Sequence, residues 1–87
     1  MIGKTLKLVS ADTGIVFYRI TGEDGSTYII KPLCKVKKGY LTIKYEGVKE
    51  SHVYKSEVGV NYLKASKREI ARIKEILDES ISNLNDP

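Results

Sequence analysis

Several residue types are scarce in this chain, and each scarcity removes a class of protein. Cys34 is the single cysteine and His52 the single histidine, which excludes an internal disulfide and a multi-cysteine zinc site. The longest apolar run, residues 15–18, is far shorter than the roughly 18 residues of a membrane-spanning helix. Residues 1–10 lack the apolar stretch of a secretory signal. We therefore predict a cytoplasmic protein without membrane segment, metal or cofactor.

The same scarcity argues against an enzyme. One histidine, one cysteine and no evident pair of carboxylates on a shared face leave no catalytic constellation. The glycines never form a phosphate-binding loop followed directly by a helix. Tryptophan and glutamine are absent while Ile, Val, Lys and Glu are abundant, a bias that is typical of thermophile proteins.

Two different patterns of apolar residues follow each other along the chain. Residues 1–62 are rich in β-branched and aromatic residues broken by Gly and Pro, and residues 66–84 follow a helical period. We predict one domain, residues 1–87, that is mostly β or α+β. Its core is a small antiparallel sheet or SH3-like barrel of five to six strands within about residues 4–62, followed by one C-terminal amphipathic helix at about 67–84.

Alternation and turn residues locate the strands. In the first hairpin, a three-residue loop within residues 22–26 would pair Ile20 with Tyr28 and place Phe17 on the opposite, solvent-facing side of the sheet. Pro32 is predicted to break the strand that precedes it or to open the next one. The predicted strands are 4–9, 15–21, 26–31, 33–36 and 40–45, with weaker patterns at 48–55 and 58–62.

The second hairpin is predicted to turn at residues 38–39. That turn pairs Val36 with Leu41 and Cys34 with Ile43, which makes one face of the hairpin apolar. The opposite face would then carry Lys35, Lys37, Tyr40, Thr42 and Lys44.

Positive charge is the strongest indication of function. Five lysines and no acid lie between Gly25 and Tyr45, and residues 1–65 carry 11 basic against 6 acidic residues. Lysines along a strand suit a phosphate backbone, and an interleaved aromatic can stack on a base. We expect the protein to bind DNA or RNA with low sequence specificity. The predicted contacts are Lys35, Lys37, Lys38 and Lys44 on phosphates, Tyr40 on a base, and Arg19 and Lys31 as flanking residues.

Two other interpretations remain open for the same residues. Exposed lysines also solubilise a sheet and protect its edges. Alternatively, the chain is a protein-interaction module, such as a small regulator or an inhibitor of a nucleic-acid enzyme, anchored by exposed tyrosines, Phe17 and Ile29. A protein partner would be sensitive to Glu23, Asp24 or Glu50.

The C-terminal helix has the clearest pattern. Residues 66–69 fit a capping box, in which Ser66 and Glu69 satisfy each other's backbone amides. The first half of the helix is mainly basic and the second half acidic, which opposes the helix dipole. An antiparallel homodimer would use both features, although a helix lying across the sheet could bury the apolar stripe within one chain. The predicted dimer seam is Ile70, Ile73, Leu77 and Leu84.

The order of elements over residues 14–84, two hairpins, a further strand and a helix on a basic chain, resembles that of the small chromatin proteins of hot-acid archaea. The resemblance concerns layout alone, and this chain adds a strand before it. It implies an SH3-like barrel and adds weight to nucleic-acid binding.

Overall fold

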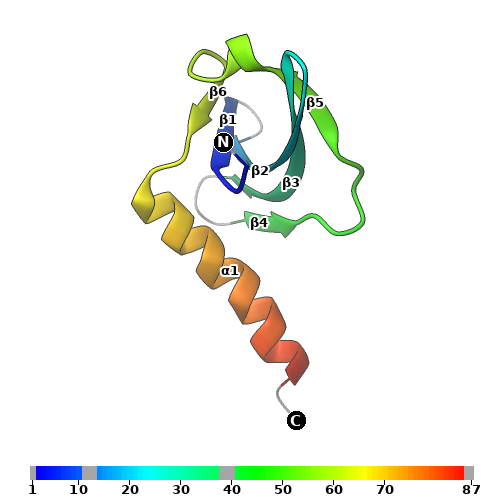
Figure 1. The fold of residues 1–87 in the computed structure, drawn as a ribbon. Helices are drawn as coiled ribbons and strands as arrows, with labels where there is room; N and C mark the ends of the chain where they lie inside the picture. The colour runs from blue at the N-terminus through cyan, green and yellow to red at the C-terminus, as the bar shows by residue number, and fades with distance from the viewer. Residues whose placement is uncertain (1, 11–13, 38–40, 86–87) are drawn as a thin grey trace.

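The computed structural model describes residues 2–10, 14–37 and 41–85, and for residues 41, 42 and 78–85 it describes the backbone alone. Six strands and a short 3-10 turn are followed by one long helix (Figure 1). The elements are β1 (Thr5–Ser10), β2 (Gly14–Asp24), β3 (Thr27–Lys37), β4 (Leu41–Lys44), β5 (Ser51–Tyr54), η1 (Lys55–Glu57), β6 (Tyr62–Lys64) and α1 (Lys67–Asn85).

The strands form one antiparallel sheet in the order β4-β3-β2-β1-β6. β3 has two partners on the same side, because residues 27–30 pair with β5 and residues 34–37 pair with β4. This arrangement confirms the predicted α+β class of a small sheet followed by one helix. Within the described residues, no ladder joins β5 to β6, so the strand pairing does not complete the ring of a closed barrel.

The sheet buries apolar side chains on both faces. We call the cluster whose buried members all come from strands the inner cluster, and the face of the sheet that bears it the inner face. The outer cluster, on the opposite face, needs one helix residue to cover three sheet residues. The inner cluster consists of Leu6, Ile20, Ile30 and Val53. The outer cluster consists of Phe17, Leu33, Cys34 and Ile73.

Pro32 does not break a strand, which corrects the prediction of two separate strands at 26–31 and 33–36. β3 runs through it, and Pro32 lies opposite Tyr18 beside a register shift. Phe17 is opposite Cys34 and Tyr18 is opposite Pro32, so Leu33 is the extra residue on β3. A bulge is where a strand tolerates proline, because the regular ladder of amide donors is interrupted there.

The first hairpin is also tighter than predicted. Asp24 pairs with Thr27, which leaves the two residues Gly25 and Ser26 as the loop. Gly25 has a φ of 59°, the left-handed conformation that glycine adopts without strain. A second register shift, between Ile20 and Gly22, then brings Ile20 opposite Ile30. The apolar face was predicted correctly because this bulge compensates for the shorter loop.

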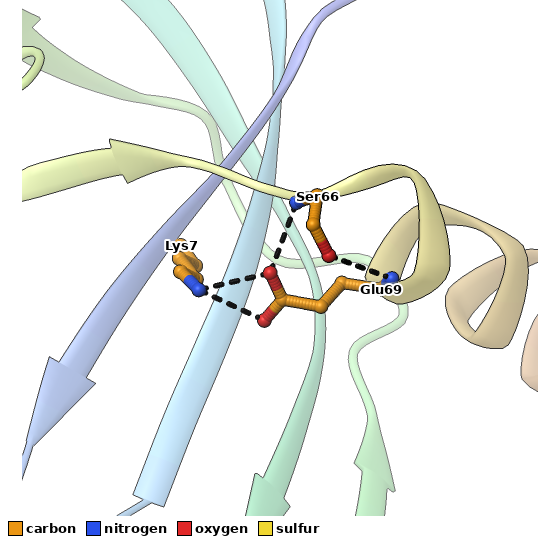
Figure 2. Close-up of polar contacts among 3 residues, drawn as sticks. All are labelled: Lys7, Ser66 and Glu69. Atoms are coloured by element: carbon orange, nitrogen blue, oxygen red, sulfur yellow. Dashed lines mark hydrogen bonds and ion pairs between the residues drawn. The ribbon is translucent and has the colours of Figure 1, made fainter.

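The helix begins at the predicted capping box (Figure 2). The Ser66 amide donates to Glu69 Oε1 at 2.9 Å, and the Glu69 amide donates to Ser66 Oγ at 3.2 Å. Lys7 Nζ on β1 donates to both oxygens of the same carboxylate, at 2.8 and 3.0 Å. Glu69 therefore caps the helix and also ties its first turn to the outer face of the sheet.

Candidate nucleic-acid interface

The register of the β3–β4 pair differs from the prediction by one residue. Cys34 lies opposite Lys44, and Lys35 lies opposite Ile43. Residues that face each other across an antiparallel pair project from the same side of the sheet. Lys44 is therefore on the outer face with Cys34, whereas Lys35 is on the inner face. The prediction that these two lysines share one face is wrong.

Loop length explains the difference. Lys37 pairs with Leu41, so residues 38–40 connect the strands where a two-residue turn was predicted. One extra loop residue moves every side chain of β4 to the other face relative to β3. Lys37 keeps its predicted relation to Lys35, two positions away on the same strand and the same face. Lys38 and Tyr40, two of the predicted contacts, lie outside the described residues.

Arg19 and Lys31 are direct cross-strand neighbours on β2 and β3. Thr5, on the other side of Arg19, continues the same row on β1. Both basic side chains are exposed on the outer face. Like charges directly opposite each other destabilise a strand pair unless an anion or solvent compensates them. The structure thus brings the two predicted flanking residues together.

Five basic residues lie on β4, β3 and β2, the three strands at one end of the strand order. We call this set the basic edge: Arg19, Lys31, Lys35, Lys37 and Lys44. Among residues whose side chains are described, none of the five forms an ion pair. Lys35 is half-buried, and the other four are exposed. Lys35 lies between Val16 and Ile43 in the strand register, and a lysine can cover such apolar neighbours with its aliphatic stem while its ammonium group reaches solvent or a ligand.

Carboxylates gather at the opposite end of the β2–β3 hairpin. Glu23 and Asp24 close that end, and Lys55 Nζ lies 3.0 Å from Glu23 Oε2. The hydrogen bond from Lys55, together with its charge, lowers the pKa of Glu23. Lys55 also lies 5.1 Å from the centre of the Tyr28 ring. The hairpin is therefore polarised along its length, acidic at its turn and basic where β3 meets β4.

The second described ion pair removes another lysine from the basic surface. Lys7 is held by Glu69 at 2.8 Å, with both side chains about three-quarters buried. Partial burial raises the pKa of Glu69, but the hydrogen bonds from Lys7 and Ser66 outweigh it, so the pKa lies below its ordinary value. This pair serves the attachment of α1 and takes no part in the basic edge.

The residues of the predicted dimer seam differ in burial. Ile73 is 4% exposed and is packed in the outer cluster of its own chain, with Leu77 half-buried beside it. Ile70 is 43% exposed. The structure does not describe the side chain of Leu84. At least Ile73 is therefore used within the chain, as the alternative of a helix lying across the sheet requires.

An apolar groove runs between α1 and the outer face of β2 and β3. Its volume is about 150 Å³, and two charged side chains, Glu69 and Arg72, lie among its lining residues. The apolar part of the lining is Ile15, Phe17, Val36, Ile73 and Ile76. The sequence pattern did not predict this groove. Its one signal was Ile76, which widens the helical stripe beyond what a single row of contacts needs.

Cysteine and histidine, two residue types that often have a chemical role, each occur once in the chain. Cys34 is fully buried, and its burial raises the pKa of the thiol, which keeps it protonated and unreactive. His52 is exposed on β5, where its Nδ1 lies 3.3 Å from Thr27 Oγ1. Within the described ranges, no three His, Cys, Asp or Glu residues are grouped as a metal site requires.

Among the described helices, none has the length and apolar character to cross a membrane. Comparison of the chain with protein-family models, with curated proteins and with solved structures found no match, so its likeness to the archaeal chromatin proteins stays a resemblance in the order of elements.

Proposed function

We propose that this protein binds nucleic acid with low sequence specificity through the basic edge. The observation that carries the proposal is that five cationic side chains on three adjacent strands form no ion pair among the described residues. Phosphate groups would supply the missing counter-charge. A cytoplasmic location, where DNA and RNA are accessible, is part of the same proposal.

The two faces of the basic edge give the proposal a definite geometry. Lys35 and Lys37 project from the inner face, and Arg19, Lys31 and Lys44 from the outer face. A backbone that follows β4 can meet cations from both sides of the strand. Contacts of this kind recognise phosphates and carry no base information, which is the reason to expect low specificity.

The test is a salt titration of binding to duplex and single-stranded DNA and RNA. With four to five phosphates neutralised, the logarithm of the binding constant should fall with the logarithm of salt at a slope of about −4. Binding that is absent at low salt, or that salt does not weaken, contradicts the proposal.

Paired variants locate the interface on one face or on both. Lys35→Gln with Lys37→Gln removes both inner cations, and Arg19→Gln with Lys31→Gln removes two of the three outer ones and leaves Lys44. Each double variant should reduce the steepness of the salt slope by about 2 if its face binds. The matched control is Lys49→Gln with Lys64→Gln, which removes the same charge from exposed positions before β5 and on β6. It should leave the slope unchanged.

A protein-interaction module is the rival proposal, and one observation favours it. Tyr54 is 62% exposed on β5, opposite Thr27 and near the acidic end of the β2–β3 hairpin. Phe17, an anchor expected from the sequence, is only 5% exposed and is unavailable. A protein partner should lose affinity when Asp24 or Tyr54 is changed to Ala, whereas nucleic acid should bind the Asp24→Ala variant at least as well.

A further inference from the structure

α1 is an amphipathic helix that its own sheet covers incompletely. Ile73 is the one buried residue among the described side chains of the helix. Ile70 is exposed, and Ile76 and Leu77 are half-buried. Helices in proteins gain most of their stability from packing of the apolar face rather than from helix propensity. The remaining apolar surface of α1 therefore calls for a further contact.

The groove beside α1 provides a receptor for such a contact. Ile15, Val36 and Ile76 line it, and Val9, the exposed neighbour of Ile15 on β1, extends its apolar surface. Arg72 is the one exposed charged residue in the lining. An occupant that fits this chemistry is apolar and carries a carboxylate where it meets Arg72.

The distal half of α1 has the sequence of such an occupant. In Figure 1 the helix runs past the sheet toward its C-terminus. The segment after Leu77 continues for about 12 Å at the rise of an α-helix. Its sequence carries Ile81 and Leu84 at helical spacing together with Asp78 and Glu79.

We propose that a second copy of this chain fills the groove. The two α1 helices lie antiparallel about a twofold axis near Ile76, and the distal half of each helix lies in the groove of the other copy. Residues 67–75 of one copy then meet residues 76–84 of the second. Arg72 faces Glu79 of the second copy, and the basic half of each helix meets the acidic half of its mate. In an antiparallel pair, the N-terminus of each helix lies beside the C-terminus of the other. Basic residues near one N-terminus, which are unfavourable for their own helix dipole, are then favourable beside the negative end of the neighbouring dipole.

Sedimentation equilibrium of the full chain at micromolar concentration tests this dimer. Ile76→Asp places two carboxylates near the twofold axis and should weaken association by at least about a hundredfold. Val60→Asp is the matched control, because Val60 is a highly exposed apolar residue outside the groove, and it should associate as the wild type does. Circular dichroism of each variant verifies that the fold is retained.

A charge swap keeps the test decisive if Ile76→Asp does not fold. Arg72→Glu changes an exposed side chain and should weaken association by about tenfold, and adding Glu79→Arg should restore it. A wild-type monomer at these concentrations overturns the proposal and leaves another protein as the occupant of the groove. A dimer that is indifferent to both Ile76→Asp and Arg72→Glu overturns it as well.

Discussion

The inner and outer clusters contain the same number of buried residues but are closed in different ways. Strands surround the inner cluster, whose members come from β1, β2, β3 and β5. The outer cluster has sheet residues on one side and a single helix residue, Ile73, on the other. A groove opens beside Ile73, whereas the inner cluster has its four members within 3% exposure. The comparison indicates that the sheet supplies most of the stability and that α1 is an attachment suited to binding.

Equivalent truncations in the two clusters should have unequal effects. Ile20→Ala leaves a cavity among strands that cannot close, so we expect the free energy of unfolding to fall by about 4 kcal/mol. Ile73→Ala should cost about 2 kcal/mol, because the helix can shift and water can enter from the groove. Urea denaturation of both variants measures the difference. Equal losses would show that the two clusters are one cooperative core.

Gly14, the first residue of β2, should tolerate no side chain. A Cβ at this position would lie 2.5 Å from the backbone oxygen of Val36, and its φ is 93°. We expect Gly14→Ala to lower the free energy of unfolding by about 3 kcal/mol, from backbone strain and steric overlap together.

Gly59→Ala separates these two costs. Gly59 has a φ of 91° but nothing within 4 Å of a Cβ, so this control carries the backbone strain alone. It should cost about 1 kcal/mol by the same denaturation measurement. A Gly14→Ala variant no worse than Gly59→Ala would mean that β2 and β3 are not held as close together as the structure has them.

The Cys34 thiol reports whether α1 leaves the sheet. Cys34 lies in the outer cluster under Ile73, and burial raises its pKa, so a thiol reagent should react slowly with the folded protein. Ile73→Ala should speed this reaction several-fold while a sheet variant of equal stability does not, because local opening of the helix exposes the thiol. Equal rates in the two variants would mean that the thiol is exposed by global unfolding.

The smallest effect concerns the ion pair at the helix start. Lys7→Met should lower the free energy of unfolding by about 1 kcal/mol or less at neutral pH. The folded pKa of Glu69 lies below its ordinary value, so the contribution is complete above that ordinary value and is lost as pH falls through the folded pKa. Denaturation at several acidic pH values should show this loss in the wild type and much less of it in Lys7→Met.

Lys55→Met is the control for that measurement. Lys55 and Glu23 form an ion pair of similar length, but both side chains are more than a third exposed. Solvent screening should make its removal nearly neutral. An effect of Lys55→Met as large as that of Lys7→Met would contradict the role assigned to the helix attachment.

Turn residues and hydrophobic spacing predicted which segments form strands and the helix. The pairing between strands determined which face of the sheet each side chain occupies. The capping box at Ser66 and the inner placement of Ile20 and Ile30 were predictable from spacing and turn residues alone. The bulge at Leu33 was not, because a bulge has no sequence signal as distinct as a turn has. The strand content and the position of α1 therefore followed from the sequence, while the continuity of β3 did not.

The same distinction applies to the basic edge. The strand pattern placed Lys35 and Lys44 on neighbouring strands correctly, but the face of Lys44 depends on whether the β3–β4 loop has two or three residues. A one-residue change in register moves a whole strand's side chains to the other face. The groove at Ile76 was beyond prediction, since it depends on how far α1 lies from the sheet.

The pairing of β1 with β6 has a consequence for synthesis of the chain. One edge of β1 receives its partner only when residues 62–64 are made, after every other strand of the sheet. During translation the nascent chain therefore presents the open backbone of β1 next to apolar strands already in place. Slow or interrupted translation before residue 62 should favour aggregation of the emerging protein, and β6, although only three residues long, ends that exposure.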